Sequence, residues 1–459
     1  MKRPDYLPEI LLGIHLALGF FAGNSGGLVF LWTISVFLIG LFWLMANGKL
    51  IWAPILASYL CGMELLVRMS SSGLPHEFTK YAVTLIFLVA LFAEGKKLYW
   101  AFVLIGLLQI PAMTLSDGGS FEQTRQLISA NFSGPVCLVV SCLYFYKRPI
   151  SPKQLQLIFV AMILPLASII GYLTINTPDW NDIEFGYGSN FETALYGPNQ
   201  VSSILGLGVM LIVVAFLIRL PLFHWKLTGL FIAGLFAFRG LLTFSRGGIF
   251  TILIVLGVLY LFWMYKTINS QRLILRNIGI MIVLVVSAYF MFDYANSLTK
   301  DALYKRYAGI KENKQLSVDQ YSSGRSLIAV IDWQIFLDHP IVGVGMGMGK
   351  VVRPKYGYPM KVAAHIEFTR LLAEHGFFGL LVILILVYMP VIHFVSSKSV
   401  YDRILIIMGV GFCFIFMTHA ATRIAAPMFI YALSFVRLVV VKKENKIDTL
   451  SRKHTLAFR

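Results

Sequence analysis

Long apolar segments recur from one end of the chain to the other, and they constrain its fold more than any other feature. A helix needs about 20 residues to cross the hydrocarbon core of a bilayer. Segments that approach this length lie at residues 7–22, 27–45, 51–66, 78–93, 98–113, 132–146, 154–176, 200–218, 227–243, 248–265, 276–293, 376–394, 402–418 and 424–440. The sequence therefore predicts an all-α, polytopic membrane helical bundle with 12–14 transmembrane helices.

Composition agrees with this prediction. Hydrophobic residues make up 58% of the chain and charged residues only 13%, which is about half their share in soluble domains. These values argue against a soluble enzyme, a disordered chain and a nucleic-acid-binding module. The cysteines all lie in apolar segments, where we expect small buried side chains and no disulfide framework. No metal-ligand spacing is evident, so we expect neither a metal site nor a cofactor.

The basic residues predict the orientation of the helices. The net charge is +17, and Lys and Arg occur in every second short loop, at 46–50, 94–97, 147–153, 219–226, 266–276 and 395–403. Cytoplasmic loops are the ones enriched in Lys and Arg. We therefore expect both termini in the cytoplasm. The tail at 441–459 is basic, as expected for a segment in contact with the cytoplasmic surface of a membrane.

A long polar segment interrupts the series of spans. It follows an N-terminal bundle at 1–293, occupies residues 294–375 on the outer face, and precedes C-terminal helices at 376–440. Long insertions of this kind are usually functional. We expect short amphipathic helices in it, one of which begins after Ser323 and lies on the membrane surface.

The first polar cluster, Thr243–Gly248, lies at an outer turn between two predicted helices. Arg246 is costly beside a membrane span, and the glycines after it allow the backbone to bring its guanidinium close to a ligand. The alternative is an interfacial arginine that extends to lipid headgroups. Arg239, seven residues earlier, either lines the same cavity or pairs with a carboxylate.

The second cluster is Ser323-Gly324-Arg325. An arginine near a helix N-terminus suits an anion, although an exposed arginine in a solvated loop has the same local pattern. The glycine-rich run at 343–349 looks like a nucleotide-binding loop, but it does not follow a predicted strand or open a βαβ unit. It predicts a close-packed extended segment instead.

The third cluster begins at His365. A histidine at the outer membrane boundary can act as a general base at neutral pH, whereas a lone histidine is more often structural. Arg370 and Glu374 are spaced as an i,i+4 ion pair, which we expect to be structural. Glu367 and Arg423 are possible supporting residues, and Arg423 either helps to bind an anion or extends to headgroups.

The ordered clusters resemble the O-antigen ligase and polymerase superfamily. The matching residues are Ser245–Gly247, Ser323–Arg325, His339–Gly345, His365–Gly379 and, less closely, Tyr196–Gln200. The resemblance covers roughly residues 195–395. His365, Gly376 and Gly379 fit the spacing of the ligases, but Ile366 stands where those enzymes carry a small polar residue. Because of this departure, a polymerase remains an alternative to a ligase.

The resemblance implies a metal-independent inverting glycosyltransferase of the bacterial inner membrane, with a periplasmic active site. Its donor would be a glycan on undecaprenyl diphosphate and its acceptor a sugar hydroxyl. The first expectation is O-antigen ligation to lipid A-core in lipopolysaccharide biosynthesis. The alternatives are a polysaccharide polymerase with the same chemistry and a polysaccharide-unit flippase or transporter. The superfamily's catalytic base corresponds to His365, and its diphosphate-binding arginines correspond to Arg246 and Arg325.

Overall fold

The computed structural model describes residues 6–23, 25–48, 50–96, 98–179, 190–311, 314–358, 364–420 and 423–439, and it is helical over most of that length. The helices that precede the outer segment are α1 (Leu7–Ala22), α2 (Gly26–Asn47), α3 (Ala53–Met69), α4 (Phe78–Glu94), α5 (Trp100–Leu107), α6 (Ile110–Met113), α7 (Phe121–Phe145), α8 (Pro152–Asn176), α9 (Pro198–Leu217), α10 (Lys226–Leu241), α11 (Arg246–Thr267) and α12 (Gln271–Leu298). The basic tail at 441–459 lies outside the described residues.

The outer segment and the C-terminal part contain the remaining elements. These are α13 (Ala302–Ala308), β2 (Ile310–Lys311), β3 (Lys314–Gln315), α14 (Val318–Ser322), α15 (Arg325–Asp338), α16 (Gly349–Val352), α17 (Glu367–Ser396), α18 (Val400–Phe416) and α19 (Ala425–Leu433). The strands β1 (Pro149–Ile150) and β4 (Arg437–Leu438) pair in parallel, and short 3-10 helices cover Leu50–Trp52, Phe191–Thr193 and Arg353–Tyr356.

Local sequence signals explain where several helices begin. Ser151 and Gln154 form a capping box at the start of α8, with Pro152 in the first turn. Ser245 caps α11 by accepting a hydrogen bond from the Gly248 N–H at 3.3 Å. Each cap satisfies backbone donors that have no partner within the helix.

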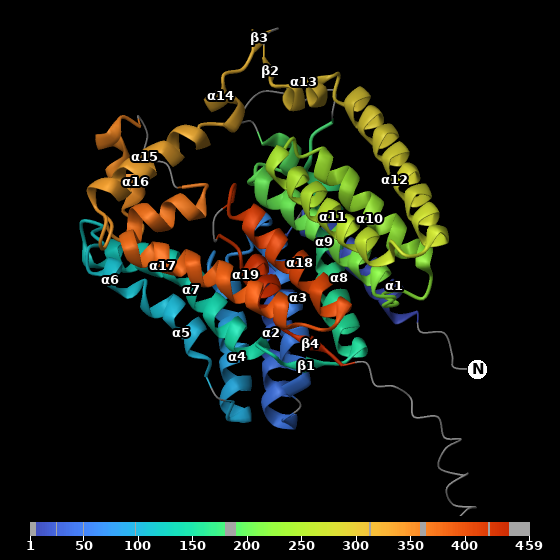
Figure 1. Cartoon of the computed structure of the whole chain (residues 1–459), viewed down its shortest axis with the longest axis horizontal. Helices are drawn as coiled ribbons and strands as arrows, with labels where there is room; N and C mark the ends of the chain where they lie inside the picture. The colour runs from blue at the N-terminus through green and yellow to red at the C-terminus, as the bar shows by residue number, and fades with distance from the viewer. Residues whose placement is uncertain are drawn as a thin grey trace, which may run out of the picture.

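The protein is a multi-pass membrane protein with an all-α bundle. Among the described residues, eight helices are long and apolar enough to cross a membrane: α2, the α3 segment, α7, α8, α9, α11, α12 and α17. The other predicted spans coincide with shorter helices. α8 lies at the centre of the bundle, where α1 and α3 pack against it, whereas α12 stands along one side with most of its surface exposed (Figure 1).

Four predicted spans differ clearly from the helices observed. The span at 98–113 is divided between α5 and α6, and the span at 132–146 is the second part of α7, which begins at Phe121. The predicted span at 376–394 is the second part of α17, which begins earlier, at Glu367, and bends at Gly376 with φ +57° and ψ −134°. The predicted span at 424–440 is wrong in its second half. There α19 ends at Leu433, and the chain turns into β4, because the Arg437 N–H bonds to the Arg148 carbonyl at 2.8 Å.

Three of the basic loops, near Glu94, Arg148 and Asp402, meet at one end of the bundle. Arg148 forms an ion pair with Glu94, and the Asp402 carboxylate accepts a hydrogen bond from the Leu438 N–H at 2.9 Å. The outer segment lies at the other end, where β2 and β3 form the top of the molecule above α13 and α14, and α15 and α16 lie beside α17 (Figure 1).

The predicted amphipathic helix is α15. It begins at Arg325, close to the expected start after Ser323. Its buried residues Ile328, Ile331 and Ile335 pack with Tyr358 and Ala373, so this face contacts protein and not a membrane surface. The exposed face still carries apolar side chains, including Trp333 at 50% exposure.

Candidate functional site

Arg246 is the first residue of α11 and is 8% exposed. The turn before it is fixed by Ser245, whose hydroxyl donates to the Asn199 side-chain oxygen at 2.8 Å. Asn199 belongs to the Tyr196–Gln200 segment at the start of α9. The two segments therefore meet in space, and together they hold the start of α11.

The guanidinium of Arg246 reaches the outer segment. It donates to the carbonyl oxygen of Arg306 at 3.3 Å and to that of Tyr321, and it lies over the Tyr321 ring with 3.8 Å between Cζ and the ring centroid. These contacts tie α13 and α14 to the bundle. They also place a buried positive charge beside the start of α15.

Arg325 occupies that start. Ser323 and Gly324 before it both have left-handed backbone conformations, with φ +57° and +77°, which turn the chain sharply into α15. The Nε of Arg325 is buried without a hydrogen-bond partner among the described residues. Burial, and then the charges of Arg246, Arg306 and Arg423, lower the pKa of Arg325 to about 10.

His365 lies two residues before α17, next to the same arginines. The Arg423 guanidinium donates to the Ala364 carbonyl oxygen at 3.1 Å, directly before the histidine. Burial, and then the charges of Arg423, Arg325 and Arg353, lower the pKa of His365 to about 4. The imidazole is therefore neutral at pH 7, which is the form that accepts a proton.

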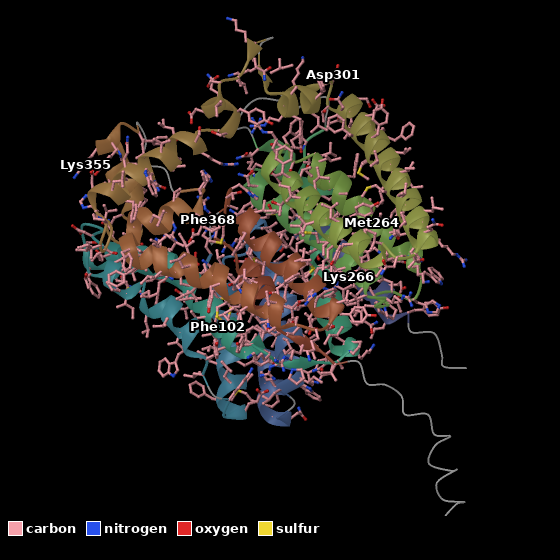
Figure 2. All side chains as sticks on the ribbon, in the orientation of Figure 1. Phe102, Met264, Lys266, Asp301, Lys355 and Phe368 are labelled. Atoms are coloured by element: carbon pink, nitrogen blue, oxygen red, sulfur yellow. The ribbon has the colours of Figure 1, made fainter. Side chains whose placement is uncertain are left out.

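The segment that carries His365 lies between the bundle and the outer segment. Phe368, just after it, packs against Phe414 of α18 with 5.9 Å between ring centroids, and it lies near the middle of the view (Figure 2). The Glu367 N–H also donates to the Met417 carbonyl at 2.7 Å. Both contacts anchor the chain just after His365.

Arg239 contacts the end of α8 and the segment before α9. It donates to the carbonyl oxygens of Leu173 and Glu192, at 3.4 and 3.1 Å, and to the Thr177 hydroxyl. It therefore braces the end of α8 against the segment before α9. The charge of Glu192 also acts on it. Of the two expected roles, the contacts favour the structural one.

Glu367 belongs to an ion-pair network, and its charge also acts on Arg423. Its carboxylate forms two hydrogen bonds with Arg370, one of them at 2.9 Å. The expected pair of Arg370 with Glu374 is confirmed, with 2.5 Å between Nη1 and Oε2. Glu374 also accepts from the N–H groups of Gly347 and Gly349, at 2.9 and 3.3 Å. The network therefore holds the glycine run.

The glycine run is a close-packed segment, as its sequence predicts. The Val344 N–H donates to the Ala373 carbonyl at 3.0 Å, where α17 bends. A Cβ on Gly343 would lie 2.4 Å from the Glu374 carbonyl carbon, and one on Gly376 would lie 2.7 Å from the Gly343 nitrogen. Only glycine permits this approach of two backbones.

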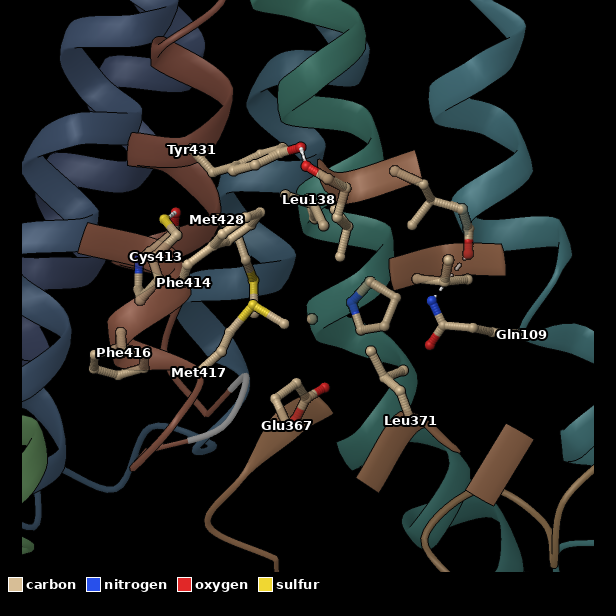
Figure 3. Close-up of a pocket in the computed structure, with 16 residues that line it drawn as sticks. Gln109, Leu138, Glu367, Leu371, Cys413, Phe414, Phe416, Met417, Met428 and Tyr431 are labelled. Carbon is tan, nitrogen blue, oxygen red and sulfur yellow. Dashed lines mark hydrogen bonds between the residues drawn. The ribbon is translucent and has the colours of Figure 1, made fainter. Parts of the chain in front are cut away.

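A small cavity of about 50 Å³ lies inside the bundle among α5, α7, α17, α18 and α19. Figure 3 shows Glu367 and Leu371 on one side of it and Tyr431 on the other, with Met417 and Met428 between them. Its walls are almost entirely apolar, and none of the arginines of the cluster lines it. The cavity therefore does not suit a phosphate.

Sequence reasoning missed several residues near the arginine cluster. Arg306 of α13 adds its charge to the cluster, and the buried Arg353 bonds to Asp332 at 2.7 Å. Arg68 and Glu64 of α3 contact the turn that carries Arg423. A charged pair inside an apolar helix is a general sequence signal of a functional or positioning role. The sequence of α3 contains one.

Comparison with known families identifies part of the chain. Residues 231–384 match the family model described as O-antigen ligase. No curated protein gave a significant match to the chain. The matched region contains Arg246, Arg325 and His365, whereas Arg423 and α3 lie outside it. The match supports the resemblance that the three clusters carry, and with it a glycosyltransferase-like activity on a polyprenyl-linked glycan donor and a sugar acceptor. Over residues 231–384, the chain is thus similar to the O-antigen ligase family.

Proposed function

We propose that this protein transfers a glycan from undecaprenyl diphosphate to a sugar hydroxyl on the periplasmic side of the bacterial inner membrane. The observation that carries the proposal is the state of Arg325. Its Nε is buried without a partner among the described residues, and every charge that acts on it belongs to another arginine. Such a site favours an anion, and a planar guanidinium fits phosphate oxygens in a bidentate manner.

The chemistry follows from the residues beside it. Neutral His365 takes the proton from the acceptor hydroxyl, whose oxygen attacks the anomeric carbon of the donor sugar. The bond between that carbon and the diphosphate oxygen breaks, and its electron pair leaves with undecaprenyl diphosphate. Arg246 and Arg325 stabilise the charge that grows on this leaving group. A single displacement of this kind inverts the anomeric configuration.

The arginines also supply the positive charge that a metal ion would otherwise bring to a diphosphate. We therefore expect transfer by the purified protein to proceed at the same rate with EDTA present. Complete loss of transfer in EDTA, restored by one divalent cation, would contradict this part of the proposal.

Within the proposal, we favour ligation to lipid A-core, and polymerisation of O-units is the alternative. The spacing of His365, Gly376 and Gly379 favours the ligase, whereas Ile366 favours the polymerase. Deletion of the gene separates the two. Loss of a ligase leaves polymer on the lipid carrier, and loss of a polymerase leaves core with a single repeat unit.

The decisive test is His365→Ala in the full-length protein. General base catalysis typically contributes about 10²- to 10⁴-fold, so we expect transfer to fall by at least the lower figure while membrane insertion is unchanged. His76→Ala, at an exposed outer histidine, is the matched control and keeps full activity. Normal transfer by His365→Ala would refute the assignment and favour the flippase or transporter alternative.

The arginines are tested separately. Lysine keeps the charge but loses the bidentate geometry. We therefore expect Arg246→Lys and Arg325→Lys to raise the KM for the donor, and the alanine variants to raise it further. Donor KM values equal to that of the wild-type protein in all four variants would refute the diphosphate role.

A further inference from the structure

Two charged residues lie buried at the outer end of α3, far from the matched region in sequence. Glu64 and Arg68 have side chains only 2% and 7% exposed, and 2.6 Å separates the Arg68 Nη2 from the Glu64 Oε1. Buried ions inside an apolar helix are costly, and they persist where they have partners and a function. Their further contacts show what this pair holds.

Both residues bind the backbone of one turn, between α18 and α19. The Arg68 guanidinium donates to the Arg423 carbonyl oxygen at 2.9 Å. The Glu64 carboxylate accepts from the Ala425 N–H at 2.7 Å. The two bonds lie on either side of Ile424, so they fix the backbone from which the Arg423 side chain leaves.

The Arg423 side chain connects this turn to the histidine. It donates to the Ala364 carbonyl at 3.1 Å, while the Glu367 N–H bonds to the Met417 carbonyl at 2.7 Å. His365 thus lies between two anchored residues. Glu367 is anchored by the Met417 carbonyl. Ala364 is anchored by Arg423, whose own backbone is held by α3.

Arg68 also reaches a third segment. Its charge also acts on the Tyr196 hydroxyl, which donates to the Gln200 side-chain oxygen at 3.0 Å. Gln200 lies in the first turn of α9, one residue after Asn199, the partner of Ser245 before Arg246. A single guanidinium therefore contacts the segment that leads to His365 and acts by its charge on the segment that leads to Arg246.

We propose that Arg68, held in place by Glu64, is a positioning residue for transfer, and that it sets Arg423 and the His365 segment against the donor site. This inference rests on the proposed function. It adds that the N-terminal bundle is part of the working site, although it lies outside the matched residues 231–384. A purely structural pair would support the fold alone.

The test is Arg68→Lys in the full-length protein, with unfolding temperature, kcat, KM and pH profile all measured. Lysine keeps the charge beside Glu64, but its shorter side chain does not place a nitrogen where the Arg68 Nη2 contacts both Glu64 and the Arg423 carbonyl. A displacement of about 1 Å at a remote residue can cost about 10²-fold in rate, so we expect kcat to fall tenfold or more with a smaller change in acceptor KM. Arg125→Lys, in the exposed pair with Glu122, is the matched control.

The pH profile separates positioning from stability. When Arg423 is released from Ala364, its charge moves away from His365, so the pKa of His365 rises and the acid limb of the profile moves to higher pH. Arg325, Arg353 and His419 also lie within electrostatic range of His365, and the substitution leaves them unchanged. A folded Arg68→Lys protein with lower kcat and this shift supports the inference.

Two results would overturn it. One is a folded Arg68→Lys protein with normal kcat and an unchanged profile. The other is a loss of activity that only parallels a loss of stability, with no shift of the profile. If Arg68→Lys does not fold, Glu64→Gln, which keeps an acceptor for the Ala425 N–H, is judged by the same criteria. Activity in His365→Ala is a separate result, because it contradicts the proposed function itself.

Discussion

Two groups of arginines lie in and around residues 294–375, and they differ in what surrounds them. Arg353 is fully buried and forms two hydrogen bonds with Asp332, at 2.7 and 3.1 Å. Arg370 lies between the carboxylates of Glu367 and Glu374. In this first group, the positive charge of each arginine is compensated by at least one carboxylate.

Arg325 represents the second group. Its neighbours Arg246, Arg306 and Arg423 all carry the same charge, and its Nε has no partner among the described residues. An isolated buried charge destabilises a fold, whereas a well-bonded ion pair costs much less. The compensated group therefore supports architecture. The second group retains positive charge at the cost of stability, as expected where a ligand supplies the negative charge.

Removal of a carboxylate from the compensated group tests this difference most strongly. Asp332→Ala removes the carboxylate that pairs with the buried Arg353 and also an acceptor of the Thr369 hydroxyl. We expect a loss of about 3–5 kcal/mol in the free energy of unfolding. Unfolding of the purified protein in detergent measures it. Glu122→Ala, in an exposed pair, should change stability by less than about 1 kcal/mol. Equal effects of the two variants would remove the basis of the comparison.

The bend in α17 joins the compensated group to the glycine run. In Gly376→Ala, the new Cβ meets the Gly343 backbone at 2.7 Å, and the residue keeps a positive φ of 57°. We expect a loss of about 1–3 kcal/mol. Gly257→Ala is the matched control, because nothing lies within 4 Å of its Cβ position in α11. There alanine should stabilise the helix by about 0.5–1 kcal/mol. A stable Gly376→Ala protein would contradict the close packing.

The sequence predicted the helices better than their ends. An apolar segment in a bilayer must satisfy its backbone hydrogen bonds internally, so apolar runs predict helices reliably. The start of α17 at Glu367 was missed because its first turns are charged and buried by ion pairs with Arg370. The end of α19 at Leu433 was missed because Arg437 and Leu438 pair with β1, a contact that no local pattern indicates.

The same contrast holds for the candidate site. Arg246 and Arg325 stand at helix starts beside glycines, and His365 has a recognisable spacing from Gly376, so local patterns indicated all three. Arg306 and Arg68 carry no such pattern. Their relation to the site depends on contacts between residues far apart in the chain, such as Arg68 with Arg423. A single sequence does not reveal contacts at that separation.

A substitution in the second group should stabilise the protein, whereas Asp332→Ala in the compensated group destabilises it. Arg325→Gln removes a buried charge whose neighbours are like charges, so we expect the free energy of unfolding to rise by roughly 1 kcal/mol. The same variant should lose donor binding. Parallel unfolding and transfer assays measure both effects. Destabilisation comparable to that of Asp332→Ala would show that Arg325 supports the fold as the compensated arginines do.

The smallest effect concerns the histidine that lies beside the second group. In the free protein, the pKa of His365 is lowered to about 4, by burial and then by Arg423, Arg325 and Arg353. A bound diphosphate offsets these positive charges, so it should raise this pKa. The profile of kcat/KM reports the free enzyme, and that of kcat reports the enzyme with bound substrate. Because a base works only above its pKa, we expect the acid limb of kcat/KM to lie near pH 4 and that of kcat to lie at higher pH.

In Arg325→Lys, which keeps the charge, the free-enzyme limb should stay in place. Acid limbs of kcat/KM and kcat at the same pH would show that the diphosphate binds away from His365, and the second group of arginines would then lose its link to the base.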